Sequence, residues 1–155
     1  MDLGRFALWA ALTAGVAAGL PACGGDQAPE PDLTTLEDLV GEWEAISVRY
    51  TTAGGTEFEL VENGGEALIS IPSGGLVTTR ISIGDYVDEW EAQWVVAGNG
   101  VLRSFPVDWS RPPRSRLFWL SQGRLTLIDS DAIFDLGLSG GPGQTAREEI
   151  VLERR

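Results

Sequence analysis

The feature that most constrains the fold is a two-residue alternation of apolar and polar side chains, which recurs from Glu42 to the end of the chain. The clearest run sets apolar residues against acidic or amide residues: Trp90, Ala92, Trp94 and Val96 against Glu89, Glu91 and Gln93. Successive side chains of a β-strand point to opposite sides of the sheet, so this pattern predicts half-buried strands. We expect Glu89 and Glu91 to face solvent, which disfavours the alternative that they form a catalytic acid/base pair.

Turn signals such as Gly98-Asn99-Gly100 separate the alternating runs at intervals of roughly ten residues. The expected strands cover residues 42–50, 57–61, 67–71, 77–83, 89–96, 101–107, 116–120, 124–129, 132–136 and 146–154. Connections are short and no long helical pattern interrupts them. The sequence therefore predicts an all-β fold, an antiparallel up-and-down barrel, with a sandwich as the alternative. A barrel removes the exposed edges that an open meander would leave.

A short helix is expected before the first strand, over residues 32–40. Thr34 and Glu37 have the spacing of a capping box. Apolar residues recur on one face at helical spacing: Leu33, Leu36, Leu39 and Val40. Gly41 is expected to end the helix. A helix this short must pack its apolar face on the barrel to be stable.

The N-terminal residues 1–22 have the parts of a secretory signal peptide: Arg5, an apolar run from Phe6 to Leu20, and Pro21-Ala22. Leu20-Pro21-Ala22-Cys23 resembles the lipobox of bacterial lipoproteins, which implies that Cys23 is acylated with fatty acids such as palmitate and anchors the chain to a membrane. The alternative is an ordinary signal peptide with an incidental cysteine. Gly24, rather than aspartate, follows the cysteine, and by resemblance this implies sorting to the outer membrane, facing the periplasm or the cell exterior. Residues 23–32 are expected to be a disordered tether and 33–155 the barrel domain.

Charge and composition exclude several functions. The chain has 11 basic and 23 acidic residues and a net charge of −12, which disfavours nucleic acid as a partner. It has no histidine and one cysteine, so the usual general base, zinc ligand and physiological pH switch are missing. We therefore expect no enzymatic activity, no cofactor and no metal site, and a single monomeric domain.

The segment Leu39-Val40-Gly41-Glu42-Trp43 resembles the Gly-x-Trp start of the lipocalin-like superfamily, and in outline the likeness extends over residues 33–155. The nearest resemblance is to small bacterial lipocalin-like lipoproteins. It implies that Trp43 closes the barrel floor and that Arg154, near the end of the last strand, packs across it. It also implies that the barrel can hold a small apolar molecule.

Four aromatic residues are the candidate ligand contacts: Trp90, Trp94, Phe105 and Trp119. We expect Trp90 and Trp94 to point into the barrel and Phe105 and Trp119 to join them. The predicted function is binding of a small apolar ligand by a membrane-anchored lipoprotein. The alternatives are that these residues form a packed core, and that the protein is a structural or protein-interaction domain of the cell envelope.

Three other clusters were weighed as sites. Arg111, Arg114, Arg116 and Trp109 are interpreted as a solvated loop, with a phosphate, a carboxylate or a partner's acidic patch as the alternative ligand. Gly137 to Gly141 matches G-x-S-x-G, but without a histidine it is interpreted as a glycine-rich loop. Asp129, Asp131 and Asp135 are interpreted as loop carboxylates, with a loose calcium site as the alternative.

Overall fold

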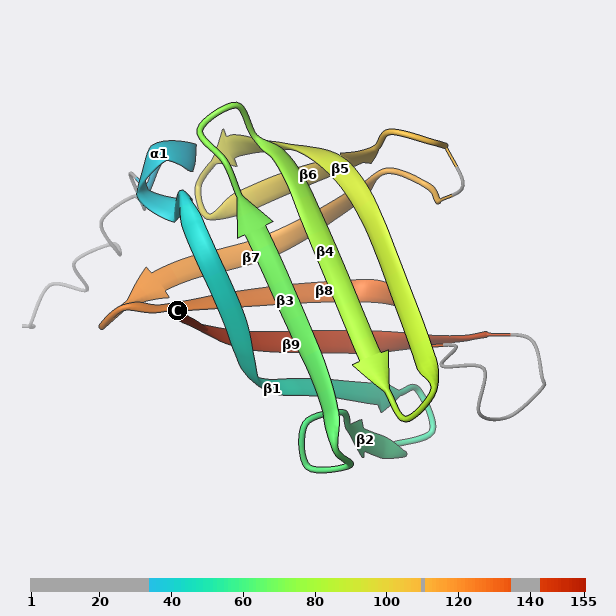
Figure 1. Ribbon diagram of the computed structural model, residues 1–155. Coiled ribbons are helices and arrows are strands. Elements are labelled where there is room, and N and C mark those ends of the chain that lie inside the picture. The colour runs from blue at the N-terminus through green and yellow to red at the C-terminus, as the bar shows by residue number, and fades with distance from the viewer. Residues whose placement is uncertain (1–33, 110, 135–142) are drawn as a thin grey trace, which may run out of the picture. The chain divides into compact units, whose positions relative to one another are not determined.

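The computed structural model describes residues 34–109, 111–134 and 143–155, and over these residues the chain is almost entirely β-strand (Figure 1). The expectations for residues 1–22, Cys23, the tether and the 137–141 loop therefore lie outside the described residues. The elements are α1 (Leu36–Leu39), β1 (Gly41–Thr52), β2 (Glu57–Glu59), β3 (Gly65–Ile71), β4 (Leu76–Ile83), β5 (Tyr86–Gly98), β6 (Val101–Pro106), β7 (Arg114–Ser121), β8 (Arg124–Phe134) and β9 (Gln144–Arg154).

Eight of the described strands close into an antiparallel barrel, which confirms the predicted fold class. Each strand from β3 to β9 pairs with the next one in sequence, and β1 pairs with both β3 and β9, so the sheet has no free end there. This is the up-and-down, lipocalin-like architecture with one short helix before β1.

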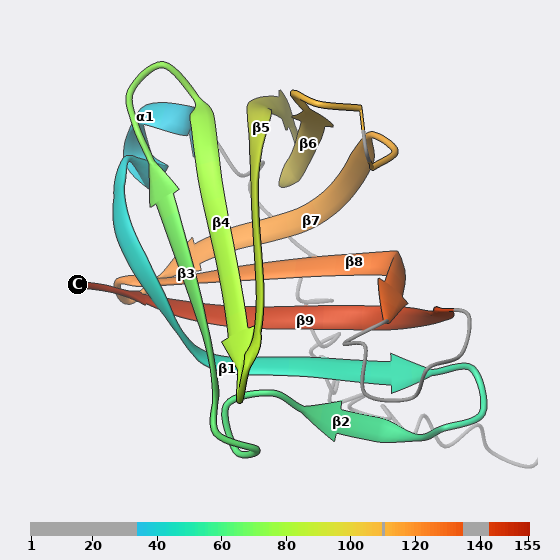
Figure 2. The ribbon, with the colours of Figure 1, turned by 45° about the vertical axis from the view of Figure 1, so that its right-hand side comes forward.

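Strand β1 turns the corner between two halves of the barrel. Its first residues, from Gly41 to Glu44, pair with β3, whereas residues from Trp43 onward pair with β9, and the register shifts between Ala45 and Ser47. In Figures 1 and 2, β3 and β4 run across the direction of β8 and β9, and β1 bends from one direction to the other. Bends and bulges of this kind are how a strand passes between crossed sheets.

The short strand β2 pairs with β1 from Arg49 to Thr51, beyond the residues of β1 that pair with β3. Beyond the β2 ladder, the backbone amide of Val48 donates to Oε1 of Glu59 at 2.7 Å, and the carbonyl of Val48 accepts from the amide of Leu60 at 2.8 Å. Leu60 is fully buried where its backbone meets β1. A side-chain carboxylate thus replaces a missing strand partner, and the buried backbone groups of β1 are satisfied.

Helix α1 is shorter than predicted and its cap lies one residue later. The Asp38 carboxylate accepts hydrogen bonds from the backbone amide of Thr35 at 2.7 Å and from its hydroxyl at 2.8 Å. The expected cap of Thr34 with Glu37 is therefore wrong. The helix must end at Leu39, which is buried, because β1 already begins at Gly41. One turn of helix before Leu39 places the N-cap at Thr35.

Two segments expected as separate strands, 124–129 and 132–136, are one strand, β8, up to Phe134. The register shifts between Asp129 and Ala132, and Oδ1 of Asp129 accepts the amide of Asp131 at 2.9 Å. That side-chain bond stabilises a bulge, so the strand bends without ending. The bulge lies beside the candidate site described next.

Candidate functional site

The barrel has one end closed by α1 and one open end, which we call the mouth. The mouth contains a cavity of about 420 Å³. Its aromatic and aliphatic lining includes residues from four strands, β1, β4, β5 and β8: Tyr50, Ile81, Tyr86, Trp90, Ile133 and Phe134. Its charged lining consists of Asp88, Arg111, Arg114, Arg116 and Glu148. The cavity therefore offers apolar surface and ion-paired polar groups together.

Aromatic rings make up one wall of the mouth. The rings of Tyr50 and Phe134 lie with centroids 4.9 Å apart, and Phe58 stacks on Phe134 at 5.4 Å. These tilted contacts are favourable for aromatic pairs and fix the ring positions. Through Tyr50 and Phe134 this wall presents apolar ring surface to the cavity.

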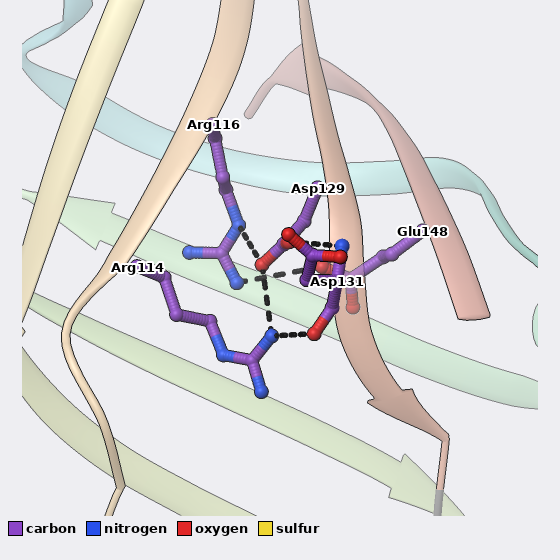
Figure 3. Close-up of polar contacts among 5 residues, drawn as sticks. All are labelled: Arg114, Arg116, Asp129, Asp131 and Glu148. Atoms are coloured by element: carbon purple, nitrogen blue, oxygen red, sulfur yellow. Dashed lines mark hydrogen bonds and ion pairs between the residues drawn. The ribbon is translucent and has the colours of Figure 1, made fainter. Parts of the chain in front are cut away.

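A row of polar side chains crosses the mouth over the adjacent strands β1, β9, β8 and β7, and Figure 3 shows its members on β7, β8 and β9. In the strand registers Tyr50 on β1 lies opposite Glu148 on β9, and Glu148 lies opposite Asp129 on β8. Arg116 on β7 reaches both carboxylates, with Nη2 at 3.4 Å from Glu148 and Nε at 3.8 Å from Asp129. Arg114 approaches Asp129 at 3.2 Å and also donates to the carbonyl of Asp131.

This row is buried although it is charged. The residues Asp129 and Glu148 are among the buried polar residues of the barrel, and the Arg116 side chain is 11% exposed. Two like charges opposite each other on neighbouring strands are destabilising unless a cation neutralises them. Arg116 supplies that cation. Its Nε, however, has no hydrogen-bond partner among the described residues, because 3.8 Å is too long for one.

Burial raises the pKa of the Tyr50 phenol well above its usual range. The Glu148 carboxylate raises the pKa further, because it repels the phenolate and hydrogen-bonds to the neutral phenol. Tyr50 is therefore a neutral hydrogen-bond donor at the edge of the cavity under all ordinary conditions.

A second ion pair lies across the mouth from this row. Nη2 of Arg111 contacts both carboxylate oxygens of Asp88, at 2.6 and 2.5 Å, and its guanidinium lies 4.1 Å from the centroid of the Trp90 ring. The solvated-loop interpretation is therefore wrong for Arg114 and Arg116, which belong to β7 and face the interior. It holds for Trp109, which is 78% exposed.

Below the mouth the barrel interior is filled. An enclosed space of about 10 Å³ lies beneath Arg116 and Glu148, and a water molecule needs at least about that volume. The side chain of Trp94 is buried in this packed region. The space large enough for a small molecule is therefore at the mouth and not deep in the barrel.

The four aromatic candidates separate into two pairs. Trp90 and Trp94 point inward as predicted, and Trp90 lines the mouth cavity. The predictions for Phe105 and Trp119 are wrong, since these side chains are 39% and 42% exposed on the outer surface. Register explains both errors, because directly opposite residues share a face. Phe105 lies opposite the exposed Gln93, whereas Trp94 lies opposite Ser104. On β7 it is Phe118, opposite Leu127, that faces the core.

At the closed end, Trp43 and Arg154 are in contact. The guanidinium of Arg154 lies 4.9 Å from the centroid of the Trp43 ring and donates to the carbonyl of Asp38. Nε1 of the fully buried Trp43 donates to the carbonyl of Leu39 at 2.8 Å. These bonds satisfy carbonyls at the end of α1 and fasten the helix over the barrel floor.

The polar row was not predicted from the sequence, although a signal was present. Glu148 shares its alternation face with Ala146, Ile150 and Leu152, and Arg116 shares one with Phe118. A charged residue on an otherwise apolar face of a strand indicates a buried, paired charge. Asp129 likewise shares an alternation face with the apolar residues Leu125 and Leu127.

A shallow groove of about 550 Å³ also lies between α1 and the end of β5. Its lining includes no charged side chain, whereas the mouth combines apolar and charged groups, so the mouth is the candidate site.

Among the residues that the structure describes, no group of three histidine, cysteine, aspartate or glutamate side chains is arranged to hold a metal ion. No helix within 34–109, 111–134 and 143–155 is long and apolar enough to cross a membrane.

Fold and cavity together define a small antiparallel β-barrel with an amphipathic mouth. Comparison with protein-family models, curated protein sequences and solved structures gives no match to this chain.

Proposed function

We propose that the protein is a lipid-anchored, lipocalin-like binding protein of the outer membrane that holds a small amphipathic molecule in the mouth of its barrel, without catalysing a reaction. The cavity of about 420 Å³ carries this proposal. Ligand pockets begin at about 300 Å³, and barrels of about eight strands can hold one small ligand.

The lining of the mouth supports an amphipathic ligand over a wholly apolar one. Tyr50 and Phe134 offer apolar ring surface, whereas Arg116 and Glu148 offer buried polar groups. Small-molecule sites combine a mostly apolar wall with a few placed polar groups that set orientation. A ligand with an apolar body and a polar end uses both parts.

The proposed anchor is compatible with an accessible mouth. The described chain begins at Thr34, beside α1 at the closed end of the barrel. A tether that joins Cys23 to this end leaves the mouth at the far end of the domain. Two or more acyl chains on Cys23 hold a protein on a membrane stably, whereas one myristoyl chain binds only marginally.

The anchor is tested with a Cys23→Ser variant expressed in a Gram-negative host. We expect the variant to lose labelling by a palmitate analogue and to leave the membrane fraction. Unchanged labelling and sedimentation with membranes would refute the anchor, independently of ligand binding.

Ligand binding is tested with a soluble form that begins at Gly24 and contains the whole barrel. A hydrophobic dye and a series of lipids are titrated while indole fluorescence and melting temperature are followed. Trp90→Ala should weaken binding, because Trp90 lines the mouth, whereas Trp119→Ala on the outer face should not. If no probe changes either signal, the mouth is not a ligand site.

A specific observation favours one second function, a contact with another envelope protein. Leu117 and Trp119 lie two residues apart on the outer face of β7, where they expose adjacent apolar surface. Exposed apolar groups of this kind mark interaction surfaces when they are contiguous. If this surface contacts another envelope protein, cross-linking in intact cells gives a discrete adduct of the two proteins, and Trp119→Ser removes it. Loss of ligand binding in the same variant would contradict this division between the two faces.

A further inference from the structure

We propose that the polar end of the ligand is uncharged and carries hydroxyl groups, as in a glycerol or sugar head, and that Arg116 holds it. This inference rests on the proposed function of the mouth. It specifies which chemical class the mouth accepts.

The charges of the mouth are already balanced. Three guanidinium groups meet three carboxylates: Arg111 with Asp88, and Arg114 and Arg116 with Asp129 and Glu148. Each guanidinium in this set has a carboxylate within 4 Å. The mouth therefore has no surplus positive charge with which to receive an anion.

An anionic head would have to displace a carboxylate that is fixed to the barrel. Asp129 and Glu148 are buried, so they cannot swing into water to make room. The anion would then lie beside two buried negative charges, which is unfavourable in an environment of low dielectric. The net charge of −12 also repels anions approaching the protein. A cationic head would be repelled by the guanidinium groups that line the same confined space.

A hydroxyl group avoids both difficulties because it donates and accepts hydrogen bonds without changing the charge. Nε of Arg116 is a buried donor without a partner among the described residues, at 3.8 Å from Asp129. A hydroxyl group in the cavity can accept a hydrogen bond from the guanidinium of Arg116, which lines the cavity, and donate one to a neighbouring carboxylate. The ligand thus completes a hydrogen-bond network that the protein leaves incomplete.

The apolar body of such a ligand contacts the aromatic wall. The paired rings of Tyr50 and Phe134 lie in the same cavity as Arg116. A monoacylglycerol or an alkyl glycoside has both parts in one molecule. These compounds therefore represent the class.

The test compares three probes with one chain length and different heads: lauroyl glycerol, laurate and dodecyltrimethylammonium. Each is titrated, below its micelle concentration, into the soluble form that begins at Gly24, by calorimetry at neutral pH. We expect lauroyl glycerol to bind roughly tenfold or more tightly than either charged probe. The preference should persist at high salt, which screens the long-range field but not contacts inside the mouth.

Each other outcome has a distinct meaning. Tighter binding of laurate overturns the inference, because the arginines then act as an anion site. Equal binding of all three probes also overturns it but leaves the mouth as a ligand site. Absence of binding by every probe removes the proposed function and the inference together.

A matched pair of variants tests the role of Arg116. Arg116→Lys keeps the neutralising charge and removes the Nε donor, and Arg124→Lys makes the same change in an exposed pair with Glu153. We expect Arg116→Lys to weaken lauroyl glycerol binding by roughly five- to tenfold, the range for one hydrogen bond, and Arg124→Lys to leave it unchanged. Wild-type affinity for the glycerol head in a folded Arg116→Lys protein would show that Arg116 does not hold the head.

Discussion

Asp129 and Glu148 lie directly opposite each other on neighbouring strands, and they are the two charged residues among the buried residues that the structure describes. Opposed like charges in a sheet are destabilising, and burial strengthens the repulsion. The arrangement is stable because Arg116 reaches both carboxylates and Arg114 reaches one of them. The stability of the mouth therefore depends mainly on Arg116, because it contacts both carboxylates.

Arg116→Met is predicted to be strongly destabilising. It keeps most of the side-chain volume but leaves the buried Glu148 without its cation and Asp129 with Arg114 alone. Loss of one partner from a buried ion pair costs about 3–5 kcal/mol. The free energy of unfolding, measured by urea titration of the soluble form, should fall by that amount.

The triple variant Arg116→Met, Asp129→Asn, Glu148→Gln separates charge from packing. Neutral amides remove the repulsion, so we expect most of the lost stability to return. If the triple variant is as unstable as Arg116→Met alone, the arginine acts through packing and not through neutralisation.

Because the pKa of Tyr50 is raised in the folded state, the protein is predicted to lose stability at high pH. A phenol whose pKa is raised in the folded state holds its proton more firmly there than in the unfolded chain. Its contribution to stability is complete below about pH 10, the unfolded value, and is lost as the pH rises through the higher folded value. The free energy of unfolding should therefore fall from about pH 10 upward.

Tyr50→Phe isolates this effect. The chain has no lysine or histidine and only two tyrosines, so few groups titrate in this range. We expect urea unfolding curves at about pH 9 and 11 to differ less for Tyr50→Phe than for the wild type. An equal difference in both proteins would mean that Tyr50 is not the titrating group.

The sequence predicted those features of the fold that depend on neighbouring residues. Alternation identified the strands and the inward face of β5, because side-chain direction follows from position along one strand. It did not place Phe105 and Trp119, because their face depends on pairing with another strand. A shift of one residue in that pairing reverses the face. The register was available only from the structure.

In the candidate site, too, only what depends on a single strand was predicted from the sequence. Trp90 was identified from the pattern of a single strand. The row of Tyr50, Glu148, Asp129 and Arg116 draws one residue from each of four strands, and β1 is far in sequence from the other three. No spacing motif encodes such a row. It could only have been suspected from charged residues on otherwise apolar faces.

Arg154→Met is predicted to loosen the closed end. The variant loses the contact with the Trp43 ring and the hydrogen bond to the carbonyl of Asp38. Together these are worth about 1–3 kcal/mol. Arg155→Met is the control, because Arg155 pairs with Glu44 in an exposed site where a salt bridge contributes about 0–1 kcal/mol. Thermal unfolding of both variants tests the difference, and equal losses would contradict a special role for Arg154.

Gly75 joins three parts of the closed end, and its replacement by alanine is predicted to be costly. Its carbonyl accepts the amide of Trp94 at 2.8 Å. A Cβ there would lie 2.7 Å from Nε2 of Gln93, 2.8 Å from Cδ2 of Leu36 and 3.0 Å from the carbonyl oxygen of Trp94. The φ angle of +73° is also unfavourable for a residue with a side chain.

Two further alanine variants separate the two causes. Gly98 has a φ of +86° with no atom within 4 Å of the added Cβ, so Gly98→Ala measures backbone strain alone, about 1–2 kcal/mol. Gly74→Ala meets no atom within 4 Å and has no such angle, so it should be nearly neutral. We expect the loss of unfolding free energy to increase from Gly74→Ala to Gly98→Ala to Gly75→Ala. If Gly75→Ala costs no more than Gly98→Ala, α1 and β5 yield to the added methyl group, and the closed end is less tightly packed than these distances indicate.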